Sequence, residues 1–245
     1  MALGSNDFET RAQRMTRAQA EASEIDVGLR QYMLRVYNYM ASGVALTGVI
    51  AAVVANDQSL VSAIMGGMVF WVLFIGILGL GWMAPKIISS GSTTAAQACF
   101  WAYAGLWGAF IAPLFLVYTG ESIARVFFIT AAAFAGTSLY GYTTKKDLAP
   151  MGRFLAMASI GILIAILVNA FLIQSSVLDY VVSIGAVLMF AGLTAYETQA
   201  IRNSYHEMDH ADVATRKAVF GAFQLYGSFI GMFIFLLHIF GVARD

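Results

Sequence analysis

The sequence contains little charge and almost no cysteine. Only 11% of its 245 residues are charged, whereas ordinary soluble domains carry about 25%. The one cysteine, Cys99, excludes an intramolecular disulfide. Basic and acidic residues number 14 each, so the net charge is zero and no nucleic-acid partner is indicated. Because 60% of the residues are hydrophobic, we expect an integral membrane protein whose main partner is the lipid bilayer.

The hydrophobic residues gather in seven stretches, each long enough to span a membrane as a helix, which takes about 20 residues. These stretches cover roughly residues 32–55, 61–83, 95–118, 122–142, 154–173, 177–199 and 218–242. Pro113 interrupts the third stretch, where a proline can kink a membrane helix without destroying it. The sequence therefore predicts an all-α domain of seven transmembrane helices over residues 31–245, after a polar cytosolic tail over residues 1–30.

The lysines and arginines predict the orientation of these helices. Nearly all of them lie in the N-terminal tail and in the loops that follow the second, fourth and sixth predicted helices. Cytosolic loops carry an excess of basic residues, so the N-terminus is predicted to be cytosolic. An odd number of spans then places the C-terminus outside.

Glu197 is the most informative charged residue, because it follows an uncharged run from Val181 to Tyr196. A charge inside the bilayer costs about 2.5–3.5 kcal/mol on insertion scales and usually marks a functional site. Glu197 is therefore the first candidate for a functional group. The alternative is that its side chain reaches the membrane interface beside Arg202.

Polar and small residues line up along the last predicted helix. Gln224, Gly231 and His238 lie seven residues apart, and Gly227 and Ser228 lie beside that line. Lipid does not stabilise such a stripe, so we expect the last helix to be central, with the stripe facing the bundle interior or a water-filled cavity. The residues expected to line a pore are Gln224, Gly227, Gly231, His238 and, from the sixth helix, Thr194. The simpler alternative is that these polar side chains only form hydrogen bonds between helices.

The segment from His206 to His210 reads H-E-M-D-H. In a helix, H-E-x-x-H places two zinc-binding histidines one turn apart, with the glutamate as general base. Here the motif lies in a polar loop, and a charged residue, Asp209, fills one of its inner positions. A zinc metalloprotease is therefore the least favoured interpretation, and a solvated loop is the favoured one.

Four stretches of the chain resemble the Bax inhibitor-1 family, also called the transmembrane Bax inhibitor motif family. They are Gly28–Met40, Tyr140–Leu155, Gly192–Tyr205 and Leu225–Gly241, the first of which is similar to bacterial members. The resemblance implies seven helices with the last surrounded by the other six. It also implies a pH-responsive ion leak, chiefly of calcium, in the cytoplasmic membrane of a bacterium, with no enzymatic activity and no cofactor.

The resemblance assigns the pH sensor to two acids, one in the sixth helix and one in the seventh. The first is Glu197, in A-Y-E-T-Q, whereas the second is an aspartate in many members and is Ser228 here. Two carboxylates that share a proton perturb each other strongly, so a single acid puts a shared-proton gate in doubt. Calcium takes six to eight oxygen ligands, so Glu197 could contribute only to a weak calcium site.

An ionised Glu197 in a low-dielectric site needs a basic partner. Lys86 is the first candidate, and Arg202 and Arg153 lie at the same predicted end of the bundle. The sequence thus suggests a latch in which protonation of Glu197 breaks such a pair and raises the ion flux. The alternative function is a non-conducting membrane partner that modulates other membrane proteins or their proteolysis.

Overall fold

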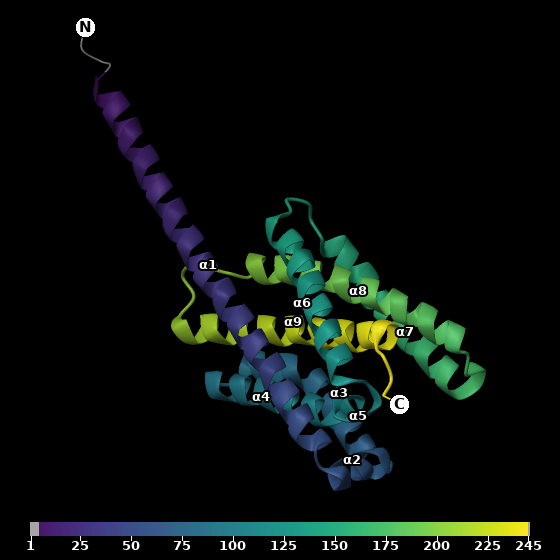
Figure 1. Ribbon diagram of the computed structural model, residues 1–245. Helices are drawn as coiled ribbons and strands as arrows, with labels where there is room; N and C mark the ends of the chain where they lie inside the picture. Colours follow the sequence, from purple (N-terminus) through teal and green to yellow (C-terminus); the bar gives the residue numbers. More distant parts are fainter. Residues whose placement is uncertain (1–4, 245) are drawn as a thin grey trace.

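The computed structural model describes residues 5–244, and the side chains of residues 27–244. This part of the chain consists of helices joined by short connections and contains no β-strand. The helices are α1 (Ser5–Ala55), α2 (Gln58–Met65), α3 (Met68–Ser90), α4 (Thr93–Ile111), α5 (Leu114–Val117), α6 (Gly120–Thr143), α7 (Ala149–Val168), η1 (Asn169–Ile173), α8 (Ser176–Asn203) and α9 (Ala211–Phe240). The π-helical turn η1 follows α7 directly and completes the same spanning segment (Figure 1).

Seven helical segments in this part of the chain are long and apolar enough to cross a membrane. Their number agrees with the sequence prediction, but the second predicted stretch, residues 61–83, is wrong in its bounds. The chain forms the short helix α2 and then a separate spanning helix, α3. The two are divided at Gly66 and Gly67, where Gly67 has a φ of 102°, a conformation that glycine adopts without steric cost.

Pro113 separates α4 from α5, whereas the sequence predicted a kink within one helix. The helix stops at Ile111, and the single turn of α5 follows Pro113 before the chain reverses into α6. Proline has no backbone N–H to donate, and its ring clashes with the preceding turn. The kink therefore sits at the end of the third span rather than in its middle.

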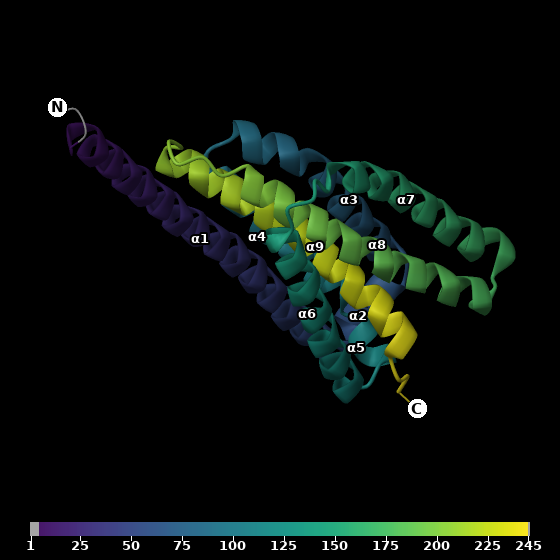
Figure 2. The ribbon, with the colours of Figure 1, turned by 90° about the horizontal axis from the view of Figure 1, so that it is seen from above.

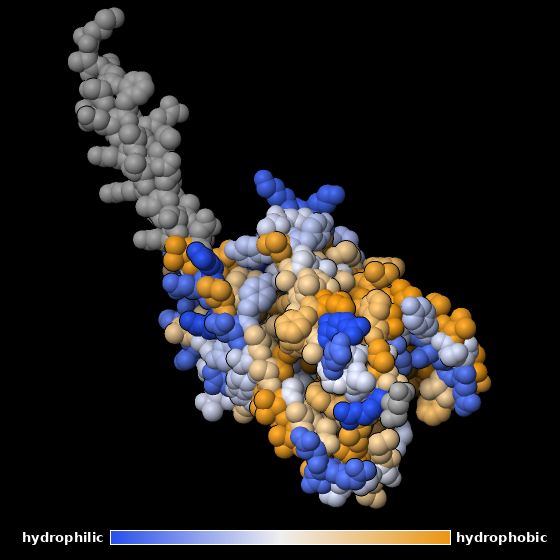
Figure 3. Space-filling view, in the orientation of Figure 1, coloured by the Kyte–Doolittle hydropathy of each residue, from blue (hydrophilic) through white to orange (hydrophobic). Residues whose placement is uncertain are grey.

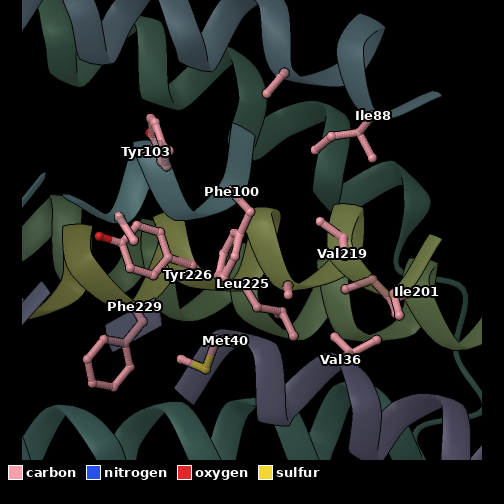
Figure 4. Packing of buried hydrophobic residues seen from close by; sticks show 14 of the residues in the cluster. Val36, Met40, Ile88, Phe100, Tyr103, Ile201, Val219, Leu225, Tyr226 and Phe229 are labelled. Atoms are coloured by element: carbon pink, nitrogen blue, oxygen red, sulfur yellow. The ribbon is translucent and has the colours of Figure 1, made fainter. Parts of the chain in front are cut away.

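The last helix, α9, occupies the centre of the bundle. Each of the seven spans contains an apolar window of 18 residues. In α9, 67% of the window is buried inside the protein, whereas the buried share of the window is at most 33% in every other described span. Figure 4 shows Leu225 and Tyr226 of α9 between Val36 of α1 and Phe100 of α4. This confirms the predicted central position of the seventh span, which depends on close packing because lipid provides no hydrophobic driving force between helices.

The helices α3 and α7 lie at the periphery. Only 11% of the α3 window and 6% of the α7 window are buried, and Figure 3 shows hydrophobic residues over the side of the molecule that carries α7 and the start of α8. Large apolar side chains such as Phe154, Met157 and Ile160 point away from the protein on α7. In a membrane these surfaces face lipid.

At the end that carries most of the lysines and arginines, two basic side chains of α9 close the ends of other helices. Arg216 donates to the carbonyl oxygens of Ser89 (3.1 Å) and Gly91 (2.9 Å), where α3 ends. Lys217 donates to the carbonyl of Ser204 (3.0 Å), where α8 ends. The last carbonyls of a helix lack intrahelical donors and favour a positive charge, so these contacts fix α9 to its neighbours.

Candidate functional site

The candidate site lies between α8 and α9, which run antiparallel along the middle of the molecule (Figure 2). Ser228 of α9 donates a hydrogen bond from its Oγ to Oε2 of Glu197 on α8, at 2.7 Å. Glu197 is half-buried, whereas Ser228 and the neighbouring Thr194 and Thr198 are buried. The structure thus brings together the two residues that stand where the resemblance predicts a pair of acids.

The four residues from Tyr196 to Gln199 each contact a different element. The ring of Tyr196 packs so closely against Gly152 of α7 that a Cβ atom there would lie 2.5 Å from it. Glu197 joins α9, as described above, and Thr198 shares a hydrogen bond of 3.0 Å with Ser138 of α6. A shift of α8 at this point therefore disturbs three neighbouring helices at once.

Gln199 holds the loop between α6 and α7. Its Nε2 donates to the carbonyl of Lys146 at 2.7 Å, and its Oε1 accepts from the backbone N–H of Leu148 at 2.8 Å. The side chain is buried, so both of its polar ends are satisfied where water is scarce.

A line of hydroxyl groups continues from Thr198 to α1. The Oγ of Ser138 lies 2.6 Å from the hydroxyl oxygen of Tyr37, in addition to its contact with Thr198. This line joins α1, α6 and α8 next to Glu197. Close packing supports it, because Gly141 of α6 lies directly against the backbone of Ala195 on α8, with no room for a Cβ atom.

The basic partners expected for Glu197 are not beside it. Within residues 27–244, none of the ion pairs includes Glu197. Arg202 instead donates from Nη1 to the carbonyl of Tyr142 at the end of α6, and both Lys86 and Arg153 are exposed. The expected pairing is therefore replaced here by the Ser228 hydroxyl, while a gating role for Lys86 or Arg202 stays a prediction.

Other residues expected along the interior stripe of α9 have different surroundings. Gly231 lies against Phe190 of α8, whereas a Cβ atom on Gly227 would meet nothing within 4 Å. Gln224 is half-buried, and Thr194 donates to the carbonyl of Phe190 on its own helix at 2.8 Å. None of these positions by itself defines a pore.

His238 does not face the interior, which corrects the expectation from its seven-residue spacing. It lies near the far end of α9 with about half of its side chain exposed, and its Nε2 is 3.3 Å from Oδ2 of Asp179, near the start of α8. Gly231 and His238 both face α8, but at the height of His238 the two helices are no longer enclosed by the bundle.

The residues of the H-E-x-x-H motif do not form the helix that a zinc site requires. Residues 205–210 lie in turns between α8 and α9, and Asp209 pairs with Lys217 at 2.6 Å. Within the described residues, no three His, Cys, Asp or Glu side chains gather as metal ligands would. The two histidines therefore lack the one-turn spacing on a helix face that the motif presupposes.

Seven apolar helical segments with a buried last helix define a multi-pass helical membrane protein. The chain belongs to the Bax inhibitor-1 family: the family described as inhibitor of apoptosis-promoting Bax1 matches residues 29–245. The match begins in the first spanning helix, leaves out most of the N-terminal tail and covers every residue of the candidate site.

Bacterial relatives match over nearly the whole chain. A protein of Caulobacter vibrioides is 38% identical over 251 aligned positions, covering 98% of this chain and 100% of the relative. An uncharacterized protein of Rickettsia prowazekii is 40% identical, covering 90% of this chain and 93% of its own length. The inner membrane protein YbhL of Escherichia coli is 39% identical, covering 89% and 94%.

Proposed function

We propose that this protein is a pH-responsive cation leak of the bacterial inner membrane, with calcium as the expected permeant ion and Glu197 as the proton-sensing group. The observation that carries the proposal is the hydrogen bond between Glu197 and Ser228, at 2.7 Å, where α8 meets the buried helix α9. The family membership and the inner-membrane relative support the location.

The surroundings of Glu197 suggest the sign of the pH response. An ionised carboxylate inside the bundle is costly unless a base or water compensates it, and among the described residues its one side-chain hydrogen bond comes from a neutral serine. The protonated acid is compatible with a dry, closed contact between α8 and α9. The ionised acid favours entry of water and a cation, so we expect the flux to rise as pH increases, opposite to the latch inferred from sequence.

A site with one carboxylate is better suited to a cation that passes through than to a cation that stays bound. Calcium bound stably takes six to eight oxygen ligands, whereas Glu197 and Ser228 offer few, and the described part of the chain holds no cluster of acidic and histidine ligands. Conduction requires an ion to enter a site and also to leave it. A weak site at Glu197 is consistent with that requirement.

Flux assays in proteoliposomes at several pH values test the proposal. Vesicles with a calcium-sensitive dye inside would receive wild type, Glu197→Gln, or the control Glu121→Gln, which alters an exposed acid paired only with Arg125 on the same helix. We expect wild type to leak calcium more strongly as pH rises. Glu197→Gln, which mimics the neutral acid, should leak little at every pH, while Glu121→Gln should follow wild type.

The position of Ser228 gives a second test of the same site. Ser228→Asp restores the acid that many family members carry, and two adjacent carboxylates titrate as a coupled pair. The midpoint of the pH response should therefore move. If Glu197→Gln keeps the wild-type pH profile, Glu197 is not the sensor, and if folded wild type shows no flux at any pH, the non-conducting alternative replaces the leak.

A further inference from the structure

A groove runs between α1 and α6, which lie side by side over the second half of α1 (Figure 2). Three cavities of about 560, 400 and 240 Å³ follow one another along it. Phe134 lines both the first and the second cavity, and Phe127 and Phe229 line both the second and the third. The cavities are therefore sections of one groove, which we call the α1–α6 groove.

The walls of the α1–α6 groove are apolar and built partly from small residues. Ala41, Ala45 and Gly48 of α1 face Ala131 and Ala135 of α6 across it, while α9 forms its floor with Phe229. A Cβ atom on Gly48 would meet nothing within 4 Å. Because the residues on both walls are small, their side chains leave a space between α1 and α6 that the protein does not fill.

The length of the groove fits one acyl chain. Its α1 wall runs from Met33 to Gly48, about 22 Å at 1.5 Å per residue. A bilayer has a hydrocarbon core of about 30 Å, so one leaflet contributes about half of that. The groove is therefore longer than one leaflet is thick, so an acyl chain can lie inside it over the whole length of that chain.

One end of the groove carries positive charge. Arg30 lines the first cavity together with Tyr142, and the guanidinium of Arg202 is bonded to the carbonyl of that same tyrosine. Arg30 is exposed at the entry to the spanning part of α1. Arginine binds phosphate oxygens with two parallel hydrogen bonds, and basic residues at the membrane surface favour anionic lipids.

We propose that the α1–α6 groove is a binding site for an anionic phospholipid, with an acyl chain between the two helices and its phosphate at Arg30. The apolar walls select a hydrocarbon chain, and the charge at one end selects an anionic headgroup over a zwitterionic one. The line from Tyr37 through Ser138 to Thr198 borders the same cavity, so the bound lipid would touch residues that reach α8.

Photolabelling of the full-length protein in detergent tests this site. The probe is phosphatidylglycerol with a diazirine in its acyl chain, compared with phosphatidylcholine carrying the same chain, each at one equivalent. We expect labelled peptides from residues 33–48 and 127–135, and more label from phosphatidylglycerol. Loose contact with lipid would instead label α7, which has the least buried window of the seven spans.

Two pairs of variants separate the chain site from the headgroup site. Gly48→Leu fills the part of the groove far from Arg30 and should reduce labelling, whereas Gly161→Leu places the same side chain at an equally open glycine on α7 and should not. Arg30→Gln should reduce the preference for phosphatidylglycerol about fivefold, whereas Arg153→Gln, an exposed arginine of α7, should leave it unchanged. A single elution peak and an unchanged melting temperature establish that each variant is folded.

Four results would overturn the proposal. The groove is not a lipid site if the label spreads over α7 as much as over α1 and α6. It does not select anionic lipid if wild type takes both probes equally, or if Arg30→Gln keeps the preference. Unchanged labelling in folded Gly48→Leu would place the acyl chain elsewhere.

Discussion

Adding one methyl group at Gly231 should destabilise the protein, although alanine normally strengthens a helix. A Cβ atom at this position would lie closest to Cζ of Phe190 on α8 and 2.6 Å from both of its Cε atoms. The ring must move by at least about 0.8 Å to reach an ordinary contact of 3.4 Å, and it is stacked on Phe235 with a centroid distance of 6.1 Å. Overpacking of this kind costs about 1–3 kcal/mol.

Gly227, one turn earlier on α9, is the matched control. A Cβ atom there would meet nothing within 4 Å, so Gly227→Ala should gain the helix propensity of alanine, up to about 1 kcal/mol. The same gain applies to Gly231→Ala, so the difference between the two variants isolates the clash with Phe190.

Thermal unfolding of the two variants in the same detergent measures this difference. At about 2–4 °C for each kcal/mol in a chain of this size, Gly231→Ala should melt about 2–12 °C below Gly227→Ala. A larger side chain should widen the gap: Gly231→Leu should be worse than Gly76→Leu, because the nearest atom to a Cβ on Gly76 is 3.5 Å away. Equal melting temperatures for Gly231→Ala and Gly227→Ala would refute the close packing of α8 on α9.

Three further predictions concern topology, the histidine loop and α2. A reporter fused after Asp245 should read outside, and one inserted in residues 204–210 should read cytosolic; a cytosolic reading at both contradicts the orientation. Replacing His206 and His210 together with alanine should change neither the melting temperature nor the flux, and loss of a stoichiometric metal would contradict this. The hydroxyl and backbone N–H of Ser59 hold the pKa of Asp57 below its ordinary value of 3.8. The Asp57 carboxylate should therefore cap α2 fully above pH 3.8, and the cap should be lost as the pH falls through the lowered pKa of Asp57. The protection of the amides of residues 58–65, measured as exchange relative to the intrinsic rate at each pH, should therefore fall in acid in wild type, and Asp57→Asn should remove that change.

The number of spans and the central last helix could be predicted from sequence, because hydropathy and the placement of polar residues report them directly. The break between α2 and α3 was missed, since apolar residues lie on both sides of Gly66 and Gly67 and a hydropathy window does not register backbone conformation. Asp57 was an available signal, because aspartate is favoured at a helix N-cap and here accepts from the backbone N–H of Ser59.

The pair of Glu197 and Ser228 came from the family resemblance, and the structure brings the two residues together. The basic partner was mispredicted because charge distribution identifies an end of the bundle but not a face of a helix. Arg202 follows Glu197 by five residues, about 140° around an α-helix, so it points toward α6 while Glu197 points toward α9. Gln199 was also missed, since its two backbone partners lie in a loop that sequence does not position.

The helix at the centre of this protein is made after the six spans that surround it. When α8 has been completed, residues 204–245 are still to be added, which takes about 2–8 s at 5–20 residues per second. During that interval Glu197 has been synthesised but Ser228 has not. The surfaces of the earlier helices that later pack against α9 are still uncovered. Insertion must therefore keep the earlier spans loosely associated until the final one enters between them, so truncation before α9 would remove the core rather than trim an edge.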